Sequence, residues 1–338
     1  GDWSSDVCSS DLKNRKEIKM EFSLCCKFHK EKIAYKIYTL TNIKTLSKEK
    51  AREKIYSVVL NNIDSLQLSF DYCKNNGIKG FRLASDIIPH HTNLLDLGFL
   101  EKTDLDFFRE KLQNLNPYDL ILSMHPGQFV NMGSPNPEVI KSSVRELKEH
   151  LFIANSIGFG DINFHLGGTY GDKITAMKNF ITNMRLEFTP EELSKFTLEN
   201  DEFNYSINEV VEVCHELSIP AVFDIHHQRV YNNKFGLSHD TLEEEFLLAR
   251  ETWKGRKWQR LHISSPKNGF ENIKDSRAHA DFINSATLLE FLKVAKNNNK
   301  ELNVMIEAKQ KDRALLFLAE ALKVNKEVEF CDKASFII

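Results

Sequence analysis

The chain has 338 residues, which is enough for one large domain or two smaller ones with a substantial buried core. Its 41% hydrophobic and 28% charged residues are typical of a globular protein, and no apolar run reaches the roughly 18–20 residues of a membrane helix. The net charge of −3 excludes a globally basic surface, so a nucleic-acid partner would have to meet a local basic patch.

The first residues and the cysteines allow two predictions, one about a leader segment and one about the redox state of the thiols. Residues 1–12 are rich in Ser and Asp and lack the apolar core of a signal peptide. We therefore expect residues 1–19 to be a non-native or disordered leader, and residues 20–338, from Met20 onward, to be one domain. The six cysteines show no CxxC spacing, which indicates reduced thiols in a cytoplasmic protein.

Short apolar runs alternate with segments of helical periodicity along the chain. The runs expected to be strands are 20–28, 78–84, 120–124, 161–165, 196–200, 221–225, 260–264 and 302–308. The segments expected to be helices are 48–76, 103–115, 137–157, 172–186, 206–218, 239–252 and 313–323, with a further long helix within 277–296. Eight strands alternating with helices, without a Gly/Pro-rich linker, predict a single parallel (β/α)8 TIM barrel.

A residue that can bind a metal stands at or near the end of six successive strands. These residues are His125, His165, Glu199, Asp224, His262 and Glu307, with His226 and His227 directly after Asp224 and His279 following the seventh strand. Active sites of this barrel lie at the carboxyl ends of the strands, so we expect these side chains to converge on one face. A single histidine at a strand end is more often a hydrogen-bonded rim residue, but six compatible residues in succession favour a metal cluster.

The types of residue suggest the ions and the chemistry. Several carboxylates packed together repel one another, and divalent cations relieve that repulsion. Mixed nitrogen and oxygen ligands suit Zn²⁺ or Mn²⁺ and argue against a site for Mg²⁺ alone. About eight protein ligands are too many for one ion, so two or three ions with a bridging carboxylate fit better. Clusters of this kind perform in-line displacement at phosphorus.

Two adjacent histidines compete for one position. Asp224 and His226 lie on the same face if the strand continues past Asp224, so strand periodicity favours His226. If the strand ends at Asp224, His227 is free to turn inward. The spacing leaves both alternatives open.

Several longer motifs resemble the UV damage endonuclease family. They are NGIKGFRLASDIIPH, SMHPGQF, HLGGTYGDK, LEND, VFDIHH, LHISSP, HAD and IEAKQKD, and the resemblance runs from about residue 21 to residue 323. The family is similar in fold to endonuclease IV. The resemblance implies a monomeric DNA repair enzyme of the prokaryotic cytosol or nucleoid. It would act on double-stranded DNA containing UV photoproducts or related base lesions, nicking the 5′ side by multi-metal-ion hydrolysis and leaving a 3′-hydroxyl.

The resemblance also implies a set of ligands and catalytic residues. His125, His165 and Glu199 would hold one ion. Glu199, Asp224, His262 and Glu307 would hold a second, and His227 with His279 a third. The family pattern thus selects His227 over His226, names Mn²⁺ with Zn²⁺ as the alternative, and places Glu199 and His262 in catalysis.

The DNA-facing half departs from the family pattern. The family's lesion-probing Gln-Tyr pair is Gln128-Phe129 here, which keeps the stacking face and loses the hydroxyl. A first-strand tyrosine is replaced by Leu24, and a lysine that can be carboxylated is replaced by Arg260. We expect basic residues on the same face to contact phosphates. They are Lys173, Arg229, Lys267, Lys309 and Lys311.

Two other functions use the same observations. A metal-dependent sugar isomerase of a related barrel class would place similar ligands at the strand ends, although the HPGQF and IEAKQKD blocks speak against it. A non-catalytic damage-binding protein would fit the missing tyrosine and lysine. Aldose–ketose turnover separates the first alternative from the endonuclease, and lesion binding without cleavage separates the second.

Overall fold

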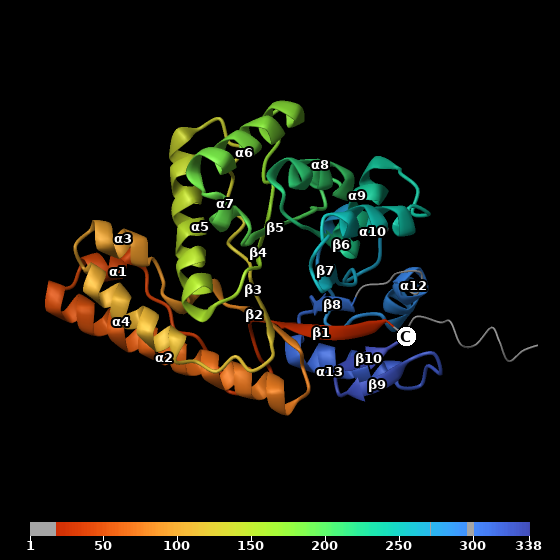
Figure 1. Ribbon diagram of the computed structural model, residues 1–338, viewed down its shortest axis with the longest axis horizontal. Helices are drawn as coiled ribbons and strands as arrows, with labels where there is room; N and C mark the ends of the chain where they lie inside the picture. Colours follow the sequence, from red (N-terminus) through yellow and green to blue (C-terminus); the bar gives the residue numbers. More distant parts are fainter. Residues whose placement is uncertain (1–17, 271, 296–300) are drawn as a thin grey trace, which may run out of the picture.

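The computed structural model of the chain describes residues 18–270, 272–295 and 301–338 (Figure 1). Eight of its strands run parallel and close into a ring, because β1 (Lys19–Cys25) pairs with β2 (Gly80–Leu83) on one side and with β8 (Glu301–Ile306) on the other. In Figure 1 the red β1 lies near the blue β8, which comes from the opposite end of the chain. The predicted (β/α)8 barrel is therefore confirmed.

The strands are short and mostly buried. Between β2 and β8 they are β3 (Ile121–Met124), β4 (Ile162–His165), β5 (Phe196–Glu199), β6 (Ala221–Asp224) and β7 (Trp258–Ile263). Burial on both faces is expected when helices cover the outside of a parallel sheet. Residues 1–17 of the expected leader lie outside the described residues, while Ile18 is buried and Lys19 begins β1.

Helices between the strands cover the outside of the ring. They are α1 (Leu40–Lys44), α2 (Lys48–Asn75), α3 (His91–Asp96), α4 (Lys102–Gln113), α5 (Pro137–Ile157), α6 (Lys173–Glu187), α7 (Pro190–Leu193), α8 (Ile207–Leu217), α9 (Ile225–Phe235), α10 (Leu242–Glu251), α11 (Ile273–Ser276), α12 (Ser285–Ala295) and α13 (Lys311–Leu322). A 3₁₀ turn covers Ser85–Ile87. Among the described residues, no helix combines the length and the hydropathy that crossing a membrane would require.

One predicted strand ends earlier than expected, and one predicted helix occupies only the second part of its range. The strand expected over 221–225 ends at Asp224, whose side chain caps α9 by accepting a hydrogen bond from the His227 backbone N–H at 2.8 Å. The helix expected within 277–296 is α12, which begins at Ser285 and thus lies inside the expected range. The segment before it forms a loop in which His279 makes a β-bridge with Pro266.

A hairpin at the end of the chain was not predicted. β9 (Glu329–Asp332) and β10 (Ser335–Ile337) are antiparallel, and β10 pairs with Lys19 to Glu21 of β1. β2 pairs only with the second half of β1, Ser23 to Cys25. The hairpin therefore supplies hydrogen bonds to the first half of β1, which β2 does not reach.

Alternation along the strands separates an apolar outer layer from a polar interior. Phe164 of β4 packs against Phe180 of α6 with ring centroids 6.0 Å apart, so this side of the strand faces the helices. The neighbouring residues Asn163 and His165 then face the interior of the barrel, since successive strand side chains point in opposite directions.

Candidate metal centre

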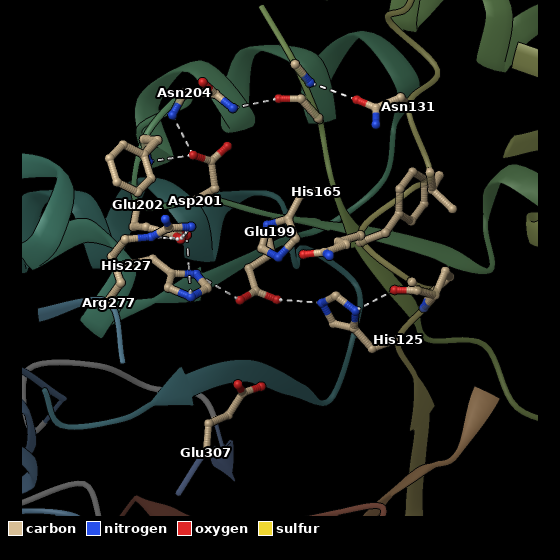
Figure 2. A pocket seen from close by; sticks show the side chains of 18 of the residues that line it. His125, Asn131, His165, Glu199, Asp201, Glu202, Asn204, His227, Arg277 and Glu307 are labelled. Atoms are coloured by element: carbon tan, nitrogen blue, oxygen red, sulfur yellow. Dashed lines mark hydrogen bonds and ion pairs between the residues drawn. The ribbon is translucent and has the colours of Figure 1, made fainter. Parts of the chain in front are cut away.

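Glu199, at the end of β5, lies at the centre of the predicted ligands (Figure 2). Two groups of side chains each bring one ligand atom per residue to within 4.8 Å of the others. The first group is His125, His165 and Glu199, and the second is Glu199, Asp224 and His227. Because Glu199 belongs to both groups, its two carboxylate oxygens suit a bridge between two ions.

Imidazole rings surround the Glu199 carboxylate, which is only 1% exposed. Its Oε2 lies 3.0 Å from His262 Nδ1 and 3.5 Å from His125 Nε2. Its Oε1 lies 3.3 Å from His227 Nδ1. One ring from β7 and two rings that follow β3 and β6 therefore reach the same side chain of β5, as the map of strand ends predicted.

Charge at the centre is divided between carboxylates and imidazoles. Burial opposes ionisation of Glu199, but His262 and His165 outweigh it and hold the pKa of the carboxyl well below its usual range. Burial also opposes a charged His227, but Asp224 and Glu199 outweigh it and raise the pKa of this imidazole well above its usual value. Burial raises the pKa of the Asp224 carboxyl. Anionic and imidazole groups are thus packed together away from water, an arrangement that divalent cations stabilise.

The adjacent histidines take different positions, and the geometry favours His227. Because α9 begins directly after Asp224, the residue three positions later lies on the same side, while the residue two positions later points away. Accordingly, His227 Nδ1 lies 3.7 Å from Asp224 Oδ2. His226 packs against His279 with ring centroids 5.4 Å apart, and burial lowers its pKa to about 3. The strand-periodicity argument for His226 is wrong because the strand stops at Asp224.

Glu307 follows β8 and is held by a residue that the sequence analysis did not select. Arg82 Nη1, from β2, lies 2.5 Å from Glu307 Oε1. His262 Nδ1 lies 3.3 Å from the same oxygen, and His279 Nδ1 lies 3.8 Å from Oε2. Burial opposes ionisation of Glu307, but Arg82 and His262 outweigh it and lower the pKa of the carboxyl. His262, His279 and Glu307 thus adjoin the two tight groups without belonging to them.

The donor set suits divalent metal ions. His165 Nδ1 and Asp224 Oδ2 are buried, and neither has a hydrogen-bond partner among the described residues. Buried polar atoms in proteins nearly always have a partner, so such orphans at the centre of a His/Glu/Asp cluster point to a site for a cation. Both imidazole nitrogens and carboxylate oxygens are available, which fits a mixed-ligand site.

Five of the candidate ligands line a cavity of about 560 Å³ at the carboxyl ends of the strands: His125, His165, Glu199, His227 and Glu307. The cavity is also lined by two cations, Arg82 and Arg277, and by Gln128 from the loop after β3. Arg277 is paired with Glu202 at 2.6 Å. The cavity thus joins candidate metal ligands with groups that can contact an anionic substrate.

Comparison with known proteins identifies the family. The family model described as UV-endonuclease UvdE matches residues 21–336. The UV DNA damage endonuclease of Bacillus cereus strain G9842 is 32% identical over 306 residues, which cover 87% of this chain and 91% of that protein. The chain belongs to the UV-endonuclease UvdE family. It is therefore a DNA repair endonuclease, a hydrolase that acts on DNA.

Related proteins support the same placement. The UV DNA damage endonuclease of Bacillus mycoides strain KBAB4 is 32% identical over 289 residues, covering 84% of this chain and 87% of that protein. The crystal structure of SacUVDE matches with a TM-score of 0.75 and 25% identity, over 90% of this chain and 98% of that chain. Endonuclease IV from Thermus thermophilus shares the fold, with a TM-score of 0.54 and 14% identity over 90% of this chain and 99% of that chain.

The residues expected to meet DNA occupy several positions around the UvdE-family cavity. Gln128 lines the cavity, and the side chain of Phe129 is 82% exposed. The side chain of Lys309 is exposed and is not among the residues that line the cavity. Its backbone N–H donates a hydrogen bond to the carbonyl oxygen of Ala280 at 3.0 Å. Two of the other basic residues are engaged in ion pairs, Lys173 with Glu209 and Arg229 with Glu290.

Tyr170 is a cavity residue that the sequence analysis did not select. Its side chain is 48% exposed and its backbone has φ +50°, which is rare for a bulky residue. A Cβ at Gly168 would come within 3.2 Å of the Tyr170 ring, so this glycine leaves the ring its place. The motif HLGGTYGDK showed this tyrosine, but only the fold places it at the cavity.

Two departures from the family pattern are buried. Leu24 is fully buried in β1 and has no polar atom to offer the site. Arg260 is also fully buried, with Nε 2.5 Å from Asp161 Oδ2 and its guanidinium over the Trp258 ring. The arginine thus carries a permanent charge inside the barrel, below His262.

Proposed function

We propose that this member of the UvdE family nicks double-stranded DNA on the 5′ side of UV photoproducts and related base lesions, leaving a 3′-hydroxyl. The observation that carries the proposal is Glu199, which two tight groups of candidate ligands share on the wall of a cavity. A phosphodiester bond is cut most readily where cations meet both the attacking and the leaving oxygen. A shared carboxylate is suited to hold two such ions side by side.

We assign the ligands to two or three divalent ions. His125, His165 and Glu199 would hold one ion. Glu199, Asp224, His262 and Glu307 would hold a second, and His227 with His279 a third. Bound ions, Mn²⁺ or alternatively Zn²⁺, would supply hydroxide near neutral pH and stabilise charge on the phosphate. Among these residues we place Glu199 and His262 in catalysis.

The protein's own groups would bind and orient the DNA. Arg82 and Arg277 present guanidinium groups to the cavity, and guanidinium binds phosphate oxygens in a fixed planar geometry. Gln128 and the exposed ring of Phe129 would contact bases at the lesion, and Lys309 a phosphate. We infer a monomer that works in the prokaryotic cytosol or nucleoid.

Cleavage of defined duplexes tests the proposal. Metal-stripped protein is incubated with UV-irradiated and undamaged duplexes after addition of Mn²⁺, Zn²⁺ or Mg²⁺, and the ends are mapped on sequencing gels. We expect nicks only beside the lesion, 5′ to it, and only with an added ion. Protein that retains Mn²⁺ but leaves irradiated DNA uncut would refute the endonuclease proposal, and tight lesion binding in that experiment would indicate a damage-binding protein.

The bridging role of Glu199 has its own variant. Glu199→Gln keeps the shape of the side chain but removes the charge that two ions would share, so we expect loss of cleavage in folded protein. Glu320→Gln, on the exposed face of α13, is the matched control and should cleave normally. Turnover of Glu199→Gln near that of the unchanged protein would contradict the bridge.

A further inference from the structure

A chain of buried polar side chains lies directly beneath the Glu199 carboxylate. TIM-barrel interiors are usually filled with branched apolar side chains, so a polar chain at this depth needs a reason. Its members are Asp161, Asn163, Thr197 and Arg260, each no more than 1% exposed. None of them was predicted as a metal ligand.

The contacts run without a break from one side of the barrel to Glu199. Asn163 Nδ2 donates a hydrogen bond to Glu199 Oε2. The Thr197 hydroxyl lies 3.1 Å from Asn163 Oδ1 and 2.8 Å from Asp161 Oδ1. Asp161 Oδ2 in turn pairs with Arg260 of β7, on the other side of the ring.

Strand register places these groups in successive layers. Asn163 is paired with Thr197, and His165 with Glu199, in the parallel ladder of β4 and β5. Asn163 and Thr197 thus lie one layer below the ligands on the same two strands, because side chains two residues apart share a face. The contact between the Asn163 amide and the Glu199 carboxylate crosses from the lower layer to the upper one.

The chemistry of the groups gives the chain a direction. A carboxylate only accepts hydrogen bonds, so the Asn163 amide must turn its NH₂ toward Glu199 and its oxygen toward Thr197. The single hydroxyl proton of Thr197 is then shared between Asn163 and Asp161. Arg260 compensates the charge of Asp161. Because every contact joins a donor to an acceptor, each side chain in the series fixes the orientation of the next one.

We propose that the column Asp161–Thr197–Asn163, anchored by Arg260, positions the Glu199 carboxylate so that its two oxygens face the two groups of ligands. The inference rests on the metal centre of the proposed function. Without the column, the carboxylate can rotate toward any one of the imidazole rings around it. The three members of the column are positioning residues, since they act on the centre through Glu199.

Metal affinity tests the column independently of DNA cleavage. Binding of Mn²⁺ to metal-stripped protein is measured by the electron paramagnetic resonance signal of the free ion. Loss of hydrogen bonds to metal ligands costs roughly 10–100-fold in affinity or activity, so we expect a weakening of that size in Thr197→Val and Asn163→Ala. Thr197→Ser restores the hydroxyl and should restore the affinity.

A second buried polar pair provides the matched control. The Ser23 hydroxyl donates to Asn303 Oδ1 at 2.7 Å between β1 and β8, without a contact to Glu199 in the described structure. Ser23→Ala should lower thermal stability while Mn²⁺ affinity stays unchanged. The column has no positioning role if Thr197→Val and Asn163→Ala bind Mn²⁺ as tightly as the unchanged protein. The same holds if Ser23→Ala weakens Mn²⁺ binding as much as these two variants do. An unchanged protein that binds Mn²⁺ but cuts no irradiated DNA would refute the proposed function and leave this comparison valid.

Discussion

At the scale of single residues, exposure separates the groups that can meet DNA from those that shape the site. Phe129 is 82% exposed beside the cavity, so its ring is accessible to a base that could stack on it. Tyr170, half-exposed at φ +50°, is a second aromatic ring at the same cavity. Strained backbone tends to persist at functional sites, because surrounding structure must hold it.

Removal of the Phe129 ring should weaken binding of damaged DNA. Base–aromatic stacking contributes about 1–3 kcal/mol per base, so Phe129→Ala should raise the Kd for a lesion duplex by about 5–150-fold. Fluorescence anisotropy with labelled duplexes measures this change. Leu186→Ala removes a similarly exposed apolar side chain at the far end of α6 and should bind DNA normally. Equal affinities of the two variants would remove Phe129 from the DNA interface.

The ion pair of Arg260 with Asp161 should matter for folding as well as for positioning. Removing one partner of a buried ion pair leaves an uncompensated charge and typically costs about 3–5 kcal/mol, so Arg260→Met should lower the free energy of unfolding by that order. Asp161→Asn in the Arg260→Met background should recover part of the loss. Urea denaturation of metal-free protein checks both, and a double variant no more stable than the single one would contradict the pairing.

At the scale of elements, the junction of β6 and α9 does two tasks. Asp224 ends the strand, caps the helix through the His227 backbone, and points its second oxygen to the candidate metal centre. The abrupt change from strand to helix is what turns His227 rather than His226 toward Glu199. The point where β6 ends thus decides which of the two adjacent histidines lies at the candidate metal centre.

The two tasks of Asp224 can be separated by one substitution. Asparagine caps helices about as well as aspartate, and burial raises the pKa of the Asp224 carboxyl. Asp224→Asn should therefore leave the stability of metal-free protein unchanged, or raise it by removing a buried charge. Mn²⁺ affinity should fall in the same variant because a charged ligand is lost. Calorimetry and Mn²⁺ titration check the pair of outcomes. Unchanged Mn²⁺ affinity would exclude Asp224 as a ligand.

At the scale of the whole molecule, buried neutral histidines limit stability in acid. His91, 3% exposed, packs on Phe152, and burial lowers its pKa to about 4. The unfolded chain takes up this proton near pH 6.5. Since the folded pKa lies below the unfolded one, the contribution of His91 to stability is complete above about pH 6.5 and is lost as the pH falls toward 4.

A variant without this imidazole should therefore tolerate acid better. Across that interval the loss amounts to about 3 kcal/mol, and His91→Gln should show a correspondingly smaller fall in the free energy of unfolding. Denaturant titrations of metal-free protein between pH 7 and 4 give the free energy of unfolding at each pH. The slope of this free energy against pH is compared between His91→Gln and the unchanged protein, rather than the absolute stability. Identical slopes in the two proteins would show that folding does not shift the pKa of His91.

The sequence alone determined the barrel, the family and the residue types at the strand ends. The apolar runs that form strands, and the candidate ligand at or near the end of each run, are local properties of the sequence. A parallel barrel brings the carboxyl ends of all its strands to one face, whichever helices and loops connect them. The positions of His125, His165, Glu199 and Asp224 in two tight groups follow from that rule. The longer motifs carried the family resemblance for the same reason, since each motif lies within one βα segment.

Only the tertiary structure decided which distant side chains touch. Arg82 meets Glu307 because ring closure places β1 between β2 and β8, and Arg260 meets Asp161 across the interior. His227, rather than His226, lies beside Glu199 because α9 begins at Ile225. Such contacts depend on register, closure and the point where a strand ends, and no local pattern encodes these, because each is settled by segments far apart in the chain.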